Sequence, residues 1–287
     1  MKLKTRLYIL LFGFLTTVTL TAQNQPTAPL ANSLLWEISG NGLTEKSYLF
    51  GTQHMICADK FKLKDYVTTT LSSADKLVLE IDFDDPAEMQ KMAKLTVAEK
   101  PLSETLTKEQ YHKLDSVLQA NIQMKASDFE NFTLLAIMST YISKSIKCTP
   151  KMIELELITK AMSQQKELVG LETVDAQMEA FSKGFTTDEI IDELGYNTDS
   201  YFDEMSMLYA SEKLSELYAY VTKPEMVTEN NLKYLFTDRN KNWVDKLPSM
   251  MKDQSLFIAV GAGHLAGDTG VIKLLRKAGY TVNPITK

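Results

Sequence analysis

Cysteine and histidine are scarce in this chain, and a surplus of positive charge is missing. The 287 residues include two cysteines and three histidines, which excludes a disulfide-dense miniprotein. Lysine and arginine together number 31 against 37 acidic residues, so the formal net charge is −6. No basic surplus is available to displace the counterions of a phosphate backbone. We therefore expect no nucleic-acid partner.

The overall composition is that of a packed globular protein. Hydrophobic residues make up 44% of the chain and charged residues 24%. These values exclude a wholly disordered chain and a collagen-like repeat. The length allows one large domain or two small ones.

The first 22 residues read as a signal peptide. Lys2, Lys4 and Arg6 precede a mostly apolar run over residues 7–20, and Ala22 supplies the small residue before a cleavage site. The alternative is a membrane anchor, but this run is shorter than the ~20 apolar residues that cross a bilayer, and threonines interrupt it. Cleavage would remove three positive charges and leave a net charge of −9.

We therefore predict an exported protein, periplasmic or secreted, with no retained transmembrane segment, because no later run reaches spanning length. In an oxidising compartment the only two cysteines, Cys57 and Cys148, are expected to form one disulfide. The alternative is two buried thiols that do not meet.

Short apolar runs rich in β-branched or aromatic residues predict strands that helices cover on both faces. Residues 23–32 are polar and contain proline, as in a linker, and a domain is expected over residues 33–287. The predicted strands cover residues 34–38, 47–50, 76–81, 167–170, 255–260 and 281–285.

Between these strands the sequence is helical. Capping boxes, in which a Ser or Thr is followed three residues later by Glu or Gln, begin at Thr107, Ser127 and Thr186. Helices are expected to fill residues ~86–165, and a second helical segment covers residues ~175–252. The pattern predicts an α/β fold with a mixed, mostly parallel central sheet flanked by helices and a large helical insertion between core strands.

Two of the three histidines share one local context. A predicted strand leads into Gly51-Thr-Gln-His54, and another leads into Gly261-Ala-Gly-His264. Each glycine is expected to let the chain turn as it leaves the sheet, which places an imidazole beyond the end of the strand. Ligands bind at that edge of open α/β sheets. The third histidine, His112, lies on a polar helix face and is assigned no role.

Carboxylates end two further strands. Glu80 and Asp82 lie at the end of the strand over residues 76–81, and Glu172 follows the strand over residues 167–170. If the four strands are parallel, both histidines and both glutamates converge on one edge. Two imidazoles with one or two carboxylates are a credible set of ligands for a divalent metal.

A polar cluster, Arg239 and Asn240, precedes the last core strands. An arginine here can bind a substrate carboxylate or a developing oxyanion through two hydrogen bonds. On composition alone, a surface arginine on a helix anchored by Trp243 explains the same residues.

An ordered series of motifs makes the chain resemble the TraB/GumN family, which is grouped with the TIKI proteases and the erythromycin-esterase-like proteins. The resemblance covers residues 33–286. The motifs are WEISG from Trp36, SYLFGTQH from Ser47, LVLEID from Leu77, GLET from Gly170, DRNKNW from Asp238 and VGAGH from Val260.

The resemblance implies an α/β domain whose paired Gly-x-x-His motifs and acidic residues form the active site, and a metal-dependent peptidase activity like that of the TIKI members. The family also includes membrane-attached members and a protein that shuts down a conjugation pheromone. The motif positions are Gly51, His54, Glu80, Glu172, Arg239, Asn240, Gly261 and His264.

Three functions follow from these residues. In the first, a peptide or small-molecule substrate is hydrolysed at a divalent metal (Mn²⁺, Co²⁺ or Zn²⁺) held by His54, His264 and Glu80. Glu80 or Glu172 acts as the general base, Arg239 stabilises the oxyanion and Asn240 orients the substrate. The second is a metal-free esterase with a histidine as general base. The third is a non-catalytic protein that sequesters a peptide or pheromone.

Overall fold

The structure is a computed structural model that describes residues 30–195 and 198–286. The predicted signal peptide over residues 1–22 lies outside the described residues, as does the linker up to residue 29. Within the described part of the chain, no helix is long and apolar enough to cross a membrane.

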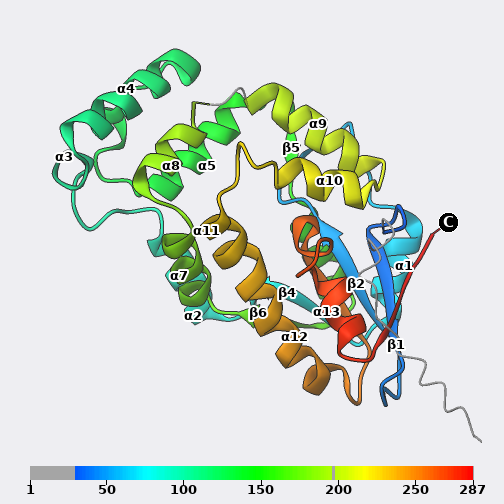
Figure 1. The fold of residues 1–287 in the computed structure, drawn as a ribbon. Coiled ribbons are helices and arrows are strands. Elements are labelled where there is room, and N and C mark those ends of the chain that lie inside the picture. Colours follow the sequence, from blue (N-terminus) through cyan, green and yellow to red (C-terminus); the bar gives the residue numbers. More distant parts are fainter. Residues whose placement is uncertain (1–29, 196–197, 287) are drawn as a thin grey trace, which may run out of the picture.

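A six-stranded mixed sheet forms the centre of the molecule, in the order β6-β4-β7-β2-β1-β8 (Figure 1). Its strands are β1 (Leu35–Ser39), β2 (Ser47–Thr52), β4 (Lys76–Ile81), β6 (Glu167–Glu172), β7 (Leu256–Gly261) and β8 (Thr281–Pro284). A separate two-stranded sheet pairs β3 (Ile56–Cys57) with β5 (Pro150–Lys151). The α/β prediction is confirmed, and each predicted strand lies within two residues of an observed one.

Four neighbouring strands run parallel. β6 and β7 flank β4 in parallel, and β2 lies parallel on the far side of β7. Only β1 runs against its neighbours, β2 and β8. Almost every residue of β4 and β7 is buried, because helices cover both faces of the sheet, and this explains their continuous apolar sequences.

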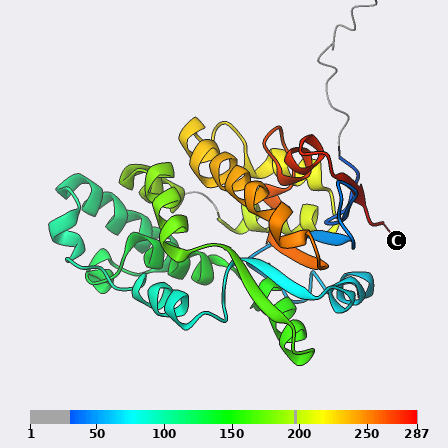
Figure 2. The same ribbon diagram turned by 90° about the horizontal axis from the view of Figure 1, so that it is seen from below.

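Helices cover both faces of the sheet. The helices are α1 (Asp65–Ser73), α2 (Pro86–Lys94), α3 (Leu102–Thr105), α4 (Lys108–Ile122), α5 (Leu134–Ser145), α6 (Ile153–Ser163), α7 (Val174–Gly184), α8 (Thr187–Glu193), α9 (Thr198–Ala210), α10 (Leu214–Val221), α11 (Glu229–Asn231), α12 (Asp238–Met251) and α13 (Val271–Lys277). Helices α1 and α6 lie against one face, and α12 and α13 against the other (Figure 2).

Part of the helical region forms a lobe with its own core. Helices α3, α4, α5 and α8 gather to one side of the sheet (Figure 1). Leu114, Leu118, Ile137 and Ile191 are almost fully buried there and belong to an apolar cluster separate from the one around the sheet. The lobe is therefore stabilised by its own helix packing.

Two of the three predicted capping boxes are confirmed. Thr107 and Thr186 begin α4 and α8 with both reciprocal hydrogen bonds present. The box predicted at Ser127 is wrong. That residue lies inside a 3₁₀ turn, η1 (Ala126–Phe129), and the Glu130 carboxylate accepts a hydrogen bond from α4 instead. A tertiary contact with α4 therefore overrides the local pattern.

The predicted disulfide between Cys57 and Cys148 is confirmed. The two Cα atoms are 5.6 Å apart, within the range that a disulfide bridges. The bond lies beside the pairing of β3 with β5, and it joins positions 91 residues apart. It therefore ties the segment after β2 to the segment before α6.

Because the disulfide closes a long loop, its removal should destabilise the folded protein. Cys57→Ser/Cys148→Ser is expected to lower the free energy of unfolding by about 2–4 kcal/mol, measured by urea titration. The wild type with its disulfide reduced is the control and should lose a similar amount. Unchanged stability in both would show that the bond constrains neither the folded nor the unfolded chain.

Candidate functional site

The ends of the four parallel strands bring the predicted site residues to one edge of the sheet. Glu172 ends β6, Glu80 is the penultimate residue of β4, Gly261 ends β7, and Gly51 is next to last in β2. The parallel arrangement on which the predicted convergence depended is therefore confirmed. The side chains at this edge then decide what chemistry it supports.

Arg239, at the start of α12, joins both glutamates. Its Nη2 lies 2.6 Å from Glu80 Oε2 and 2.6 Å from Glu172 Oε1, and its Nε lies 2.9 Å from Glu172 Oε1. All three side chains are about 90% buried. One guanidinium therefore fastens the ends of β4 and β6 to α12, with charge-assisted hydrogen bonds on both carboxylates.

The remaining nitrogen of Arg239 is also engaged. Nη1 donates to the Leu235 carbonyl at 3.1 Å and lies 3.2 Å from His264 Nε2. A guanidinium has five N–H groups, and these partners account for all of them. The predicted oxyanion role of Arg239 would therefore require a substrate to displace one of the existing bonds.

The ring of His264 is held in one orientation. Its Nδ1 lies 2.6 Å from Asn240 Oδ1, while Asn240 Nδ2 donates to the carbonyls of Thr269 (2.9 Å) and His264 (3.3 Å). Those two carbonyls require the amide nitrogen, so the amide oxygen faces the ring and Nδ1 carries the proton. Nε2 therefore presents its lone pair, which receives the N–H of Arg239.

His264 is uncharged. Burial lowers its pKa to about 3, assisted by the positive charges of Arg239 and His54 and opposed by Glu80. The rings of Trp243 and Phe236 pack against the imidazole, with centroids 4.6 and 5.0 Å away. Because the side chain is only 8% exposed, a substrate has little direct access to it.

Glu80 keeps its charge in the same surroundings. Burial opposes its ionisation, but Arg239, the two histidines and the backbone N–H of Gly261, at 2.8 Å, lower its pKa to about 2. Its Oε1 lies 4.0 Å from His264 Nε2. The buried cluster therefore combines an ionised carboxylate, a neutral imidazole and a guanidinium.

Two partners of the glutamates were not predicted. The indole N–H of Trp243 donates to Glu172 Oε2 at 3.1 Å, although the sequence presented this residue only as an apolar anchor. Gln177 on α7 donates to Glu80 and Glu172 at 3.2 and 3.1 Å. No sequence pattern marked Gln177, because its role depends on how α7 packs.

His54 lies at the outside of this edge and has a partner of its own. Its Nδ1 is 2.7 Å from Glu154 Oε1, which also accepts the hydroxyl of Thr52 at 2.6 Å. The hydrogen bond that His54 donates to the Glu154 carboxylate raises the pKa of His54 to about 9, and solvent moderates this effect because 69% of the side chain is exposed. Its charge still acts on Glu80, Arg239 and His264, so both histidines share one neighbourhood.

Glu154 was missed from the sequence. It lies in the first turn of α6, 100 residues from His54, and its side chain is only 9% exposed. The β3–β5 pairing and the disulfide join the segments that carry the two residues. No motif connects them, and only the cysteine pair, read as a constraint between segments, pointed toward this contact.

The two motif glycines act differently from the prediction. Neither Gly51 nor Gly261 has a positive φ, so the predicted need for a special turn is wrong. A Cβ at Gly51 would lie 3.0 Å from the Cβ of Ala262, in the turn η3 (Ala262–His264). Glycine at this position therefore permits the close approach of the segment that carries His264.

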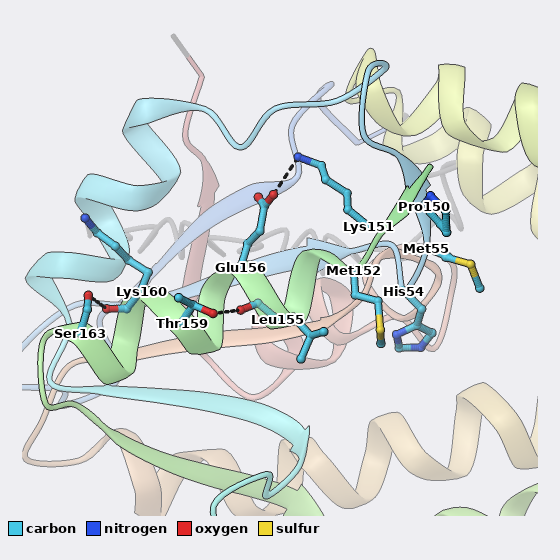
Figure 3. A pocket seen from close by; sticks show the side chains of 10 residues that line it. All are labelled: His54, Met55, Pro150, Lys151, Met152, Leu155, Glu156, Thr159, Lys160 and Ser163. Carbon is cyan, nitrogen blue, oxygen red and sulfur yellow. Dashed lines mark hydrogen bonds and ion pairs between the residues drawn. The ribbon is translucent and has the colours of Figure 1, made fainter. Parts of the chain in front are cut away.

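Two cavities reach the edge from different sides. One, of about 800 Å³, has His54 at its end and runs beside α6 (Figure 3). The other, of about 570 Å³, is lined by Glu172, Arg239 and side chains of α7 and α12. His54 lines only the first cavity, Glu172 and Arg239 line only the second, and His264 lines neither.

The ligands predicted for a metal do not fit one in this arrangement. In residues 30–195 and 198–286, no group of three or more His, Cys, Asp or Glu side chains converges on a common point. Arg239 already places a positive charge between the carboxylates and takes the lone pair of His264 Nε2. A metal on His264 would first have to displace that arginine. The metal therefore stays a prediction.

The family assignment follows from the whole of this domain. The model of the TraB/PrgY/gumN family matches residues 34–284, which extend from the start of β1 to the end of β8. The chain belongs to the TraB/PrgY/gumN family. The resemblance expected from the motifs is thus confirmed. No curated protein matches the chain. In this TraB/PrgY/gumN protein, the motif residues form the buried cluster around Arg239, and His54 lies at its exposed side.

The pKa of Glu80 predicts a stability that depends on pH. The folded-state value of about 2 lies below the ordinary value of 4.5, so Glu80 contributes stability above pH ~4.5 that is lost as the pH falls toward ~2. Glu80→Gln should cost on the order of 3 kcal/mol at neutral pH, since it leaves Arg239 incompletely paired.

The measurement is urea unfolding of wild type and Glu80→Gln between pH 2 and pH 7. The difference between the two proteins should shrink toward the acid end. Glu45→Gln, at an exposed position in the turn after β1, is the control and should match the wild type throughout. A difference that stays constant across this range would contradict the assigned ionisation of Glu80.

Proposed function

We propose that this protein is a hydrolase in which His54, oriented by Glu154, transfers the protons needed to cleave a peptide or ester bond with water. The observation that carries the proposal is the 2.7 Å contact between His54 Nδ1 and the buried Glu154 carboxylate, with the ring otherwise exposed at the end of a cavity. A carboxylate that fixes one ring nitrogen leaves the other to act on substrate.

Burying the Glu154 carboxylate costs folding free energy, and its bond to His54 accounts for keeping it there. Its Oε1 accepts from both Thr52 and His54, whereas its Oε2 is buried and has no hydrogen-bond partner among the described residues. Buried polar atoms of this kind are rare in folded proteins. Retaining such a carboxylate is consistent with a requirement for its charge beside the imidazole.

The reaction needs one histidine in two successive roles. The neutral form of His54, which predominates only above its pKa of about 9, accepts a proton at Nε2 from the attacking water, whose oxygen forms a bond to the carbonyl carbon. The imidazolium so formed is stabilised by Glu154. As the bond to the leaving nitrogen or oxygen breaks, Nε2 returns the proton to that atom, and the histidine is ready for another cycle.

The buried cluster would support this step from behind the sheet edge. Arg239, Glu80 and Glu172 hold the strand ends in place, and the charges of Glu80 and Arg239 act on His54. Asn240 is 2% exposed and contacts the ring of His264. We therefore propose that Asn240 orients the His264 ring and does not have the substrate-orienting role that the sequence predicted.

A metal-dependent form of the reaction is the alternative. One feature favours it: each histidine has Nδ1 held by a side-chain oxygen, as metal-binding histidines commonly do. Mn²⁺, Co²⁺ or Zn²⁺ would then lower the pKa of a bound water. This form requires Arg239 to release His264, and chelation distinguishes it from the metal-free reaction.

We also propose that the protein is exported, with residues 1–22 removed. The disulfide supports this proposal, because such bonds persist mainly in oxidising compartments. The N-terminal residue of the protein recovered from the periplasm or medium tests the proposal and should be Gln23. A protein retained inside the cell with its first residues intact would contradict it.

Activity toward 4-nitrophenyl acetate and a mixed peptide library tests the proposed function. His54→Ala should lower kcat/KM by about 10²–10⁴, the usual contribution of a general acid–base group. His112→Ala is the matched control, since it removes an exposed histidine from α4, and it should leave the rate unchanged. The metal-free reaction should also survive dialysis against a chelator.

Other outcomes separate the alternatives. Loss of activity on chelation, with recovery on adding Mn²⁺, Co²⁺ or Zn²⁺, would replace the metal-free reaction with the metal-dependent one. Equal activity in His54→Ala and wild type would remove His54 from the reaction. Stoichiometric binding of a peptide that is recovered intact would identify the protein as a non-catalytic, sequestering one.

A further inference from the structure

The cavity at His54 is an apolar groove along α6. It is lined by His54, Met55, Pro150, Lys151, Met152, Leu155, Glu156, Thr159, Lys160 and Ser163. Figure 3 shows His54 beside Met152 at one end, followed along the helix by Leu155 and Thr159, with Lys160 and Ser163 at the other end. The groove therefore begins at the proposed catalytic histidine and leads away from it.

Exposed apolar side chains concentrate along this helix. Of the six large apolar residues that are exposed in the described part of the chain, three belong to this one segment. They are Met152 (40% exposed) and Leu155 (49%), which line the groove, and Met162 (59%), which does not. Apolar surface left uncovered beside a candidate catalytic group commonly marks a binding site.

Several polar side chains of the groove already have partners within the protein. Thr159 donates to the Leu155 carbonyl at 2.7 Å, Ser163 donates to the Lys160 carbonyl at 2.7 Å, and Glu156 pairs with Lys151 at 2.8 Å. An extended peptide would bring one N–H and one C=O per residue that need partners. The groove walls therefore suit an occupant without a regular series of hydrogen-bonding groups.

The length of the groove narrows the choice further. Eight residues separate Met152 from Lys160, which corresponds to about 12 Å along a helix. A single amino-acid side chain covers only part of that length. An unbranched acyl chain matches both the length and the apolar lining, and the stems of the lysines can extend the apolar wall.

We propose that the groove along α6 binds the acyl chain of the substrate, so that the protein prefers esters or amides of unbranched, medium-length fatty acids. The carbonyl carbon lies at His54, and the chain runs past Met152 and Leu155 toward Lys160. The hydrolysis of these esters or amides rests on the hydrolase function proposed above, whereas the binding of the acyl chain does not.

The preference for acyl-chain length is tested with a series of 4-nitrophenyl esters from acetate to octanoate, each hydrolysed below its critical micelle concentration. Full burial of one CH₂ group raises kcat/KM by up to about fourfold, and an open groove should raise it roughly twofold for each CH₂. The ratio of kcat/KM for octanoate to that for acetate should therefore exceed about tenfold in the wild type. Leu155→Asp should lower this ratio about tenfold, and Leu155→Met should preserve it.

Val97→Asp is the matched control. It places the same charge on another exposed apolar residue (63% exposed, against 49% for Leu155) that lies outside the groove lining. The control should keep the wild-type ratio of the two rates. Thermal unfolding of each variant shows that a change in the ratio does not come from loss of the fold.

Calorimetric titration with sodium octanoate and sodium acetate measures binding without turnover. Octanoate should bind at least tenfold more tightly than acetate, and Leu155→Asp should abolish the difference. If octanoate binds in this way and no ester is hydrolysed, the acyl groove is retained and the hydrolase is rejected.

The acyl groove is overturned by any of three results. The first is hydrolysis of acetate with no gain on lengthening the chain. The second is an octanoate preference that Leu155→Asp leaves intact. The third is that apolar peptides bind and octanoate does not, and that Leu155→Asp abolishes the binding of the peptides.

Discussion

The salt bridges of Arg239 are the interaction on which the rest of the site depends. A single guanidinium neutralises carboxylates from the ends of two strands and donates to a histidine that follows a third. Two acidic side chains brought together without it would repel each other in a buried place. The same interaction fills the space between the carboxylates and occupies the lone pair of His264, so it also restricts the chemistry of the cluster.

This restriction separates the two histidines that share a sequence motif. His264 is buried, neutral and fully hydrogen-bonded, whereas His54 is exposed and paired with the carboxylate of Glu154. Equivalent motifs at neighbouring strand ends therefore have different environments. The buried member organises the edge of the sheet, and the exposed member is the one that a substrate can reach, where the groove along α6 opens.

The sequence predicted the sheet well because its strands are short, apolar and covered by helices, which leaves a clear periodicity. The edge residues Glu80, Glu172 and His264 followed from the rule that parallel strands end together. Glu154 and Gln177 could not be predicted, since each reaches the site from a helix whose packing is set by tertiary contacts. The bonds of Arg239 were also beyond prediction, because a cation between two carboxylates leaves no local pattern.

The most direct test of the account is a double-mutant cycle on kcat/KM with His54→Ala and Glu154→Gln, in an assay that the wild type supports. If Glu154 acts through His54, each single change removes the same function, and the double variant should be no slower than His54→Ala alone. Losses that multiply in the double variant would show that the two residues act independently, and the proposed pair would be rejected.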